Sequence, residues 1–273
     1  MRSLSTLSIT EQILYSTCRL IFEGNEGAWE ATGFFYKVLL PGGSQSDILV
    51  TAKHCVENAH KLKFRIRRGV GEDPIHAPKI AEIEMALYPE LVISHPTEDL
   101  AAIIVKPFIT KVERADDAKT VIFSFGQEHI PANGECDAVS NVIMAGAPIE
   151  QYDSFNDHVI FRSGITASHP AFDYKGRPRF LVDISAHEGS SGSPIFSWNP
   201  FSFNRSRREY DLHLQPQFKL IGVLESGLDV FLSEGHPSQH VNLGVAVHAK
   251  ELETLARLVI ERIINIQAGV ELP

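Results

Sequence analysis

Between Tyr15 and Val247 the chain is a succession of short runs of β-branched and aromatic residues. Clusters of Gly, Pro, Asn and Asp separate these runs, for example at residues 41–44 and 131–134. Many short strands with turn signals between them are typical of a β-barrel or a β-sandwich. The expected strands lie at residues 15–22, 33–40, 47–52, 100–105, 121–125, 142–145, 159–165, 179–184, 193–196, 218–224 and 242–247.

The two ends of the chain predict helices instead. Ser8 and Glu11 have the spacing of a capping box, in which a hydroxyl and a carboxylate satisfy free amides at a helix start. Residues 250–267 carry apolar side chains at spacings of three and four, followed by Gly269 as a stop signal. This pattern predicts an amphipathic C-terminal helix that packs against the body of the protein. Residues 198–208 are polar and irregular, and we expect a long exposed loop there.

The composition indicates an ordinary folded protein and excludes some partners. Of the 273 residues, 44% are hydrophobic and 22% are charged, and the formal net charge is -9. The one dense basic stretch, residues 61–68, alternates charged and apolar side chains, as a strand with one solvated face does. Nucleic acid is therefore not an expected partner. No apolar segment approaches the length of a membrane span, so no membrane contact is expected either.

Cysteine usage and the N-terminus suggest a compartment. The sequence has three cysteines, Cys18, Cys55 and Cys136, which is an odd and sparse set for a disulfide framework. The first residues lack the apolar core of a secretory signal. We therefore expect a cytoplasmic protein.

Three short motifs carry the residues of acyl-transfer chemistry. His54 follows the apolar run 47–50, Asp99 immediately precedes the apolar run 100–105, and Ser191 lies in the Gly-rich stretch 188–194. Attack by a serine hydroxyl needs a base, an acid that orients the base, and amide donors for the oxyanion. Histidine, aspartate and serine in this order, each at the end of a predicted strand or in a turn, supply these groups.

These motifs resemble the signatures of the trypsin-like, chymotrypsin-fold serine peptidases, which read T-A-A-H-C, D-[IVL]-A-[LV] and G-D-S-G-G-P. The resemblance covers roughly residues 15–247 and is nearest to the disulfide-free bacterial trypsin-like peptidases. It implies an all-β fold of two packed antiparallel six-stranded barrels with a short N-terminal helix and a C-terminal amphipathic helix. The expected units are residues 1–115, with His54 and Asp99; residues 116–249, with Ser191; and a helix and tail at 250–273.

The resemblance also implies roles for single residues. His54 matches the general base, Asp99 the orienting acid and Ser191 the nucleophile, while the amides of Gly189 and Ser191 match the oxyanion hole. Glu98 is an alternative acid, but Asp99 directly adjoins the apolar strand. Ser190 and Ser193 are alternative hydroxyls.

The expected substrate pocket is floored by Ser185 and walled by Glu225, Ser226, Gly227 and Gly244. A serine floor lacks the carboxylate that would select Lys or Arg, so neutral side chains are favoured. Asp183 or Glu225 would be the source of any negative charge from the side.

Two departures from the family bear on regulation. Secreted members have an aspartate before the nucleophile that pairs with a newly cleaved N-terminus, whereas this chain has Ser190. We expect activity without such cleavage, or control by another trigger such as a regulatory partner. Cys55 follows the histidine as in secreted members, but the strand at 33–38 has no cysteine to pair with it. Cys55 is expected to be a buried packing residue.

The resulting expectation is a serine endopeptidase that acts on protein or peptide substrates, with no cofactor and no metal. His236 and His240 are spaced like helical zinc ligands, but a proline between them disfavours that site. An α/β-hydrolase would have its triad in the order Ser, Asp, His. The remaining alternatives are a catalytically weak or inactive binding or scaffold protein, and a hydrolase of small esters.

Overall fold

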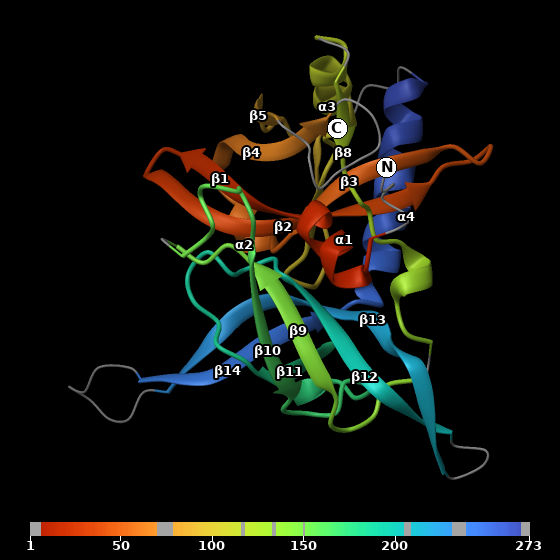
Figure 1. Ribbon diagram of the computed structural model, residues 1–273. Helices are drawn as coiled ribbons and strands as arrows, with labels where there is room; N and C mark the ends of the chain where they lie inside the picture. Colours follow the sequence, from red (N-terminus) through yellow and green to blue (C-terminus); the bar gives the residue numbers. More distant parts are fainter. Residues whose placement is uncertain are drawn as a thin grey trace.

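The computed structural model describes residues 7–69, 79–115, 118–132, 135–149, 151–204, 209–230 and 239–268. Figure 1 shows two β-rich halves stacked on each other, the first from red to gold and the second from green to blue. Few helices accompany the strands. The predicted all-β fold class, with a short helix near each end of the chain, is confirmed.

The first half is an eight-stranded sheet in the order β5-β4-β1-β2-β3-β7-β6, with β8 paired to β4. Its strands are β1 (Thr17–Gly24), β2 (Gly27–Leu39), β3 (Gln45–Thr51), β4 (Ala59–Gly69), β5 (Lys79–Ala86), β6 (Val92–Ser94), β7 (Ala101–Ile103) and β8 (Lys119–Val121). The strand number exceeds the expected six because β4 pairs with β5 along one edge and with both β1 and β8 along the other. The sequence pattern had indicated neither β5 nor β6.

The second half is a closed barrel in the order β10-β11-β14-β13-β12-β9, six strands as expected. Its strands are β9 (Asn141–Gly146), β10 (Ile160–Thr166), β11 (Arg179–Asp183), β12 (Pro194–Asn204), β13 (Glu209–Val230) and β14 (Gln239–His248). Valine, isoleucine and phenylalanine side chains from β9, β11, β12 and β13 fill its interior.

The expectation of a long loop at 198–208 is wrong for the residues that the structure describes. β12 continues to Asn204 and β13 resumes at Glu209, and the two pair along a ladder that ends at Asn204 and Glu209. Alternating aromatic residues in this stretch satisfy strand pairing, which outweighs its polar composition. Residues 205–208 and the possible histidine ligands at 236 and 240 lie outside the positions whose side chains the structure describes.

Short helices pack against strands of the first half. The capping box at the start of α1 (Ile9–Ser16) is present: the Ser8 hydroxyl accepts from the Glu11 amide, and the Glu11 carboxylate accepts from the Ser8 amide at 2.7 Å. Two short helices, α2 (Lys53–Val56) and α3 (Lys106–Glu113), lie within the first half. None of the helices in the described ranges is long and apolar enough to cross a membrane.

The C-terminal helix α4 (Glu251–Gln267) joins the two halves. It buries Leu252, Leu255, Val259 and Ile263, as the spacing predicted. Although it follows the second barrel in the chain, it packs against β2, β6 and β7 of the first sheet (Figure 1). Its apolar face belongs to a core that includes residues of both halves, such as Phe34 of β2 and Phe196 of β12. This shared core fixes the position of one half relative to the other.

Candidate active site

His54 comes from the one-turn helix α2, which begins directly after the apolar strand β3 ends. Its neighbours Cys55 and Val56 are buried. Trp29 of β2 donates its indole N–H to the Cys55 carbonyl oxygen at 2.9 Å, which anchors the turn. The His54 side chain points away from this core and is 48% exposed.

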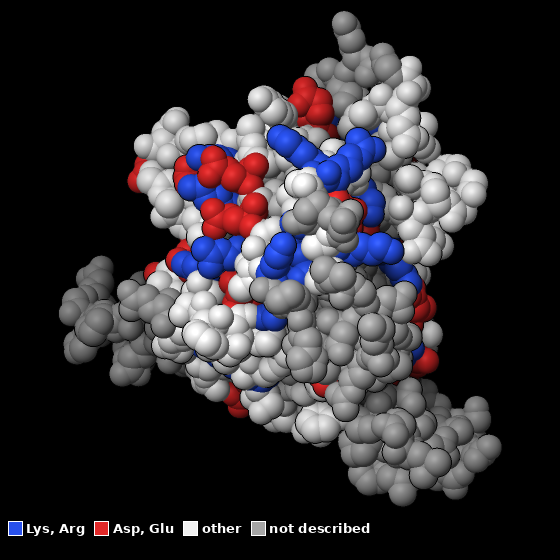
Figure 2. All heavy atoms as spheres, turned by 45° about the horizontal axis from the view of Figure 1, so that its top comes forward, with Lys and Arg blue, Asp and Glu red and all other residues white. Residues whose placement is uncertain are grey.

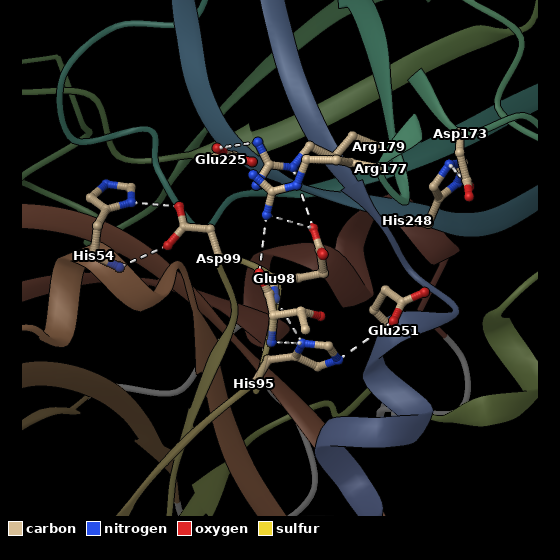
Figure 3. Close-up of polar contacts among 11 residues, drawn as sticks. His54, His95, Glu98, Asp99, Asp173, Arg177, Arg179, Glu225, His248 and Glu251 are labelled. Carbon is tan, nitrogen blue, oxygen red and sulfur yellow. Dashed lines mark hydrogen bonds and ion pairs between the residues drawn. The ribbon is translucent and has the colours of Figure 1, made fainter. Parts of the chain in front are cut away.

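His54 and Asp99 face each other across the edge of the first sheet (Figure 3). The His54 Nδ1 atom lies 2.6 Å from Asp99 Oδ2, and the His54 backbone N–H donates to Asp99 Oδ1 at 2.8 Å. In the neutral imidazole the carboxylate holds the proton on Nδ1, and Nε2 is then the nitrogen that can accept a proton. This arrangement suits a general base and the acid that orients it.

The charges of this pair perturb both groups in the directions expected of an ion pair. The hydrogen bond that His54 donates to Asp99 raises the pKa of His54 to about 10, with a further contribution from Cys55. Burial raises the pKa of Asp99, but the hydrogen bonds from His54 and the charge of Arg179 outweigh it, so this pKa lies below its ordinary value. The imidazolium and the carboxylate therefore stabilise each other.

Asp99 sits on a tight loop between β6 and β7. The Nδ1 atom of His95 accepts from the backbone N–H groups of Thr97 at 3.3 Å and Glu98 at 2.9 Å, which closes the loop on itself. The adjacent carboxylates of Glu98 and Asp99 then point in different directions (Figure 3). Asp99 meets His54, whereas Glu98, the alternative acid, points toward arginines of the second barrel.

Ser191 lies on the turn that precedes β12. Gly189 and Gly192 flank it with φ of 83° and 86°, a left-handed conformation that glycine adopts without steric cost. Ser191 is partly exposed, while Ser190 and Ser193, the alternative hydroxyls, are both 0% exposed. Of the three hydroxyls, only that of Ser191 is accessible to a substrate.

Thr32 of β2 ties the first sheet to this turn. Its backbone N–H donates to the Ser191 carbonyl oxygen at 2.9 Å. Its hydroxyl donates to the Gly189 carbonyl oxygen at 2.8 Å and accepts from the Ala147 N–H at 2.9 Å. One buried threonine thus holds both ends of the Gly189–Ser191 backbone and the segment after β9.

The same contact brings Ser191 beside the segment that carries His54. A Cβ atom added at Gly192 would lie 3.0 Å from the backbone nitrogen of Ala52, which precedes α2. Within the described ranges, no hydrogen bond joins the Ser191 hydroxyl to His54 Nε2, and that nitrogen lies 3.4 Å from Cys55 Sγ. Catalytic hydrogen bonds are often unmade in free enzymes and form when substrate binds.

The amides of the turn divide into two groups. Those of Ser190, Gly192 and Ser193 donate to backbone carbonyls. Those of Gly189 and Ser191 donate to no group in the described part of the chain. Two free amides, one from the hydroxyl-bearing Ser191 and one from Gly189 two residues earlier, are the arrangement that an oxyanion hole requires.

A group of charges, most of them largely buried, lies behind Asp99 at the junction of the two halves. This junction cluster consists of Glu98 from the first sheet and Arg177, Arg179 and Glu225 from the second barrel (Figure 3). Arg179 lies between the two acids, with Nη1 at 2.9 Å from Glu225 Oε1 and Nε at 3.4 Å from Glu98 Oε2. Arg177 approaches Glu98 Oε2 at 3.6 Å.

The junction cluster acts on Asp99 through its charges. Arg179 helps to lower the pKa of Asp99. Burial raises the pKa of Glu225, and the nearby Asp99 raises it further, while Arg179 opposes both. The positive charge of Arg179 therefore offsets the negative charges of Glu98 and Glu225, which lie beside the ionised Asp99.

The residues expected to form the substrate pocket do not all face the same space. Gly227 and Gly244 flank Ala186, since a Cβ at Gly227 would lie 3.6 Å and one at Gly244 3.7 Å from the Ala186 Cβ. The Ser185 hydroxyl forms a hydrogen bond with His187 Nε2 at 2.9 Å. Ser226 is exposed. The Glu225 carboxylate belongs to the junction cluster, where Arg179 pairs with it, and Asp183 accepts a hydrogen bond from the Asn242 amide at 3.1 Å.

No group of three or more His, Cys, Asp or Glu side chains that could hold a metal ion occurs among the described residues. The free thiols of Cys18 and Cys55 are buried.

Sequence reasoning missed Thr32 and Arg179. Thr32 is one hydroxyl in an ordinary strand, and its role depends on a contact with residues about 157 positions away. Arg179 begins a predicted strand, and no local pattern marks the acids it meets. An arginine at the edge of an apolar run was the only available signal.

Comparison with known proteins gives a likeness in structure only. No protein-family model matches the chain, and no curated protein matches it. Among solved structures, it is similar to a thermostable serine protease, AL20, from an extremophilic microorganism, with 13% identity, 91% of this chain and 98% of that chain covered, and a TM-score of 0.51. It is also similar to the HtrA-type protease AlgW with tripeptide, with 13% identity, 92% of this chain and 62% of that chain covered, and a TM-score of 0.51.

At 13% identity these similarities extend to the fold alone. The order of strands, the closed second barrel and the packing of the first sheet on it agree with that fold. The chain therefore has the fold of the trypsin-like, chymotrypsin-fold serine proteases.

Proposed function

We propose that this protein is a serine endopeptidase in which His54, Asp99 and Ser191 act as base, orienting acid and nucleophile. The observation that carries the proposal is the two-point contact between His54 and Asp99, at 2.6 and 2.8 Å, beside a glycine-flanked serine. The fold adds support, since the solved structures that resemble it carry the name serine protease. No member of this group is explained better by ordinary packing, because His54 is half exposed and Ser191 is the accessible hydroxyl.

In this mechanism His54 acts as a base in its neutral form, so activity should rise with pH toward the raised pKa of about 10. The Ser191 hydroxyl attacks the carbonyl carbon of a peptide bond while His54 Nε2 takes its proton. The carbonyl oxygen becomes negative and accepts hydrogen bonds from the free amides of Gly189 and Ser191. His54 then gives its proton to the leaving amine, and water hydrolyses the acyl-enzyme by the same steps in reverse roles. Asp99 stabilises the imidazolium in both steps, and no cofactor takes part.

The alignment step is the approach of His54 Nε2 to the Ser191 hydroxyl. In the free protein this nitrogen contacts Cys55 Sγ at 3.4 Å. A bound peptide that shields the site from water strengthens the bond to Ser191 over that weak sulfur contact. The small space beside Ala186 favours a small neutral residue at the cleavage site.

An active-site probe tests the proposal. A fluorophosphonate is expected to label full-length protein at Ser191, and the labelling is expected to disappear in Ser191→Ala and His54→Ala. Ser193→Ala is the matched control, because it removes a neighbouring hydroxyl of the same chemistry and should keep the label. Labelling that persists in Ser191→Ala would overturn the assignment.

The unmade bond between His54 and Ser191 specifically favours one alternative, a binding protein that keeps the fold without turnover. Absence of labelling in the wild-type protein, with intact folding, would support that alternative. Cleavage of casein against hydrolysis of small esters then distinguishes a peptidase from an esterase. An esterase would show rapid ester turnover and leave casein intact.

A further inference from the structure

A cavity of about 40 Å³ lies between the first sheet and the segment that precedes β10. Strands β1 and β4 form one wall, and residues 152 and 157–159 form the other. None of the three proposed catalytic residues lines it. The volume is enough for about three water molecules, which is also the scale of one small polyatomic anion.

Three buried polar atoms in the lining of this cavity have no hydrogen-bond partner in the described part of the chain. They are Thr17 Oγ1 from β1, Arg67 Nη2 from β4 and His158 Nε2 from the segment before β10. Buried polar groups are nearly always paired, and leaving one unpaired costs about 1–3 kcal/mol. Three such atoms from three separate elements around one cavity therefore point to a ligand that pairs with them.

The charges around the cavity show which of its cations is free to bind. Three of the four basic side chains in the lining have carboxylate partners: Arg19 with Glu30, Lys63 with Glu23 and Glu84, and Arg65 with Glu82 and Asp157. Arg67 has no carboxylate within ion-pair distance among the described residues, and its guanidinium lies 5.7 Å from the centre of the Tyr15 ring.

The lining around Arg67 holds both basic and acidic side chains. Figure 2 shows Lys and Arg side chains gathered over the first sheet, with acidic side chains concentrated beside them. Arg67 is close enough to His158 to lower the pKa of that imidazole, in addition to the effect of burial. A neutral imidazole with its proton on Nε2 is a hydrogen-bond donor toward the cavity. An arginine fork, an imidazole N–H and a hydroxyl are the donors that proteins use for phosphate.

We propose that this cavity is a binding site for a phosphate group, held by Arg67, His158 and Thr17. The three donors approach from different elements, which suits a tetrahedral anion better than a flat carboxylate. The small volume admits the phosphate and leaves the rest of a phosphomonoester outside. The ligand is thus inorganic phosphate or the terminal phosphate of a small metabolite.

Asp157 is the group that opposes binding. It lines the same cavity, lies 3.8 Å from Arg65, and has its pKa raised by burial despite the surrounding arginines. A carboxylate beside the phosphate weakens binding by repulsion between like charges. Removing the charge of Asp157 should therefore strengthen phosphate binding, whereas removing Arg67 should weaken it.

The test is titration of the full-length protein with inorganic phosphate, followed by calorimetry and by ³¹P line broadening, at constant ionic strength set with sodium chloride. Saturable binding is expected in the wild-type protein. Arg67→Met should weaken it at least about tenfold, Arg67→Lys by less because the charge remains, and Asp157→Asn should strengthen it severalfold. Phenyl phosphate in a parallel titration distinguishes a phosphomonoester from the free ion by its tighter binding.

One control variant and one further test variant accompany this titration. Arg257→Met removes one exposed positive charge from α4, where Arg257 pairs with Glu261, and should leave phosphate binding unchanged. Thr17→Val removes one donor with little change in shape and serves if Arg67→Met does not fold. Binding that does not saturate, or that falls equally in Arg67→Met and Arg257→Met, would overturn the site and leave only general attraction to positive charge.

Discussion

The junction cluster and the phosphate cavity each have a central arginine, but they differ in whether that arginine is paired with acids. In the junction cluster, Arg179 has an acid on each side, and both lie within ion-pair distance. In the cavity, Arg67 has no acid within that distance among the described residues, and the neighbouring atoms Thr17 Oγ1 and His158 Nε2 have no hydrogen-bond partner there either. The central arginine of the junction cluster is thus paired with acids within the chain, whereas the central arginine of the cavity gains an anionic partner, among the described residues, only when a ligand binds.

This difference predicts opposite responses to the loss of the central arginine. Removing one partner of a satisfied buried ion pair leaves an uncompensated charge, whereas removing an unpaired cation relieves one. Stability, measured by urea unfolding, is therefore the direct way to compare the two groups.

The largest effect is expected for Arg179→Met. The substitution keeps the side-chain volume but leaves Glu98, which is 4% exposed, without its nearest cation. We expect a loss of about 3–5 kcal/mol in the free energy of unfolding. Arg177→Met is the matched control, because Arg177 is half exposed and lies 3.6 Å from the same acid, so its loss should cost less than about 1 kcal/mol. Equal effects of the two substitutions would contradict the central role of Arg179.

A smaller, pH-dependent effect is expected for Asp99→Asn. The raised pKa of His54 means that the folded state binds its proton more tightly than the unfolded state, where the value is near 6.5. The resulting stabilisation is fully present below about pH 6.5 and is lost as the pH rises toward about 10. Asn accepts the same backbone hydrogen bond without the charge, so the variant should lack this dependence.

Unfolding of both proteins in urea from pH 5 to 10 would measure the effect, and NMR titration of His54 should give a lower pKa in the variant. The lowered pKa of Asp99 adds stability that is lost only when the pH falls through that value, at the acid end. The stability difference between the two proteins should therefore be greatest in mildly acidic solution. A constant difference across this range would rule out the ion pair as its source.

Glu225→Gln should change stability by less than about 1 kcal/mol near neutral pH, because Glu98 still pairs with Arg179. The pKa of Glu225 is raised by burial, so its ionised form is disfavoured in the folded state. As the pH falls toward 4.5, the wild-type protein should gain stability relative to the variant, since the folded state binds the proton first. Glu261→Gln, on the exposed face of α4, provides the control. An advantage of the wild-type protein that grows with rising pH would contradict the assigned environment of Glu225.

The sequence predicted the elements whose cause is local. Alternating and β-branched runs marked most strands, spacing marked α4, and the Ser8 and Glu11 pair marked the start of α1. The strand β5, the helix α3 and the extension of β12 were missed, because their patterns are short or polar and pairing with distant strands decides their structure.

The candidate site divides in the same way. The residues proposed for catalysis lie in motifs that can be read along the chain, and His54 and Asp99 do meet. The groups that hold them, Thr32 and Arg179, depend on contacts across the interface of the two halves, which no local pattern encodes. The orientation of Glu225 likewise depends on a distant contact. The family's spacing assigns Glu225 to the pocket wall, whereas its carboxylate pairs with Arg179.

The smallest effect is expected for Arg67→Met. Because Arg67 Nη2 is buried without a hydrogen-bond partner in the described part of the chain, loss of Arg67 should leave the free energy of unfolding in sodium chloride unchanged or raise it by about 1 kcal/mol. In saturating phosphate, by contrast, the wild-type protein should become the more stable of the two, since a ligand that binds only the folded state adds to its stability. Thermal unfolding of both proteins with and without phosphate at equal ionic strength measures this reversal. A large loss of stability in sodium chloride alone would mean that Arg67 is satisfied within the chain, and the contrast with Arg179 would then fail.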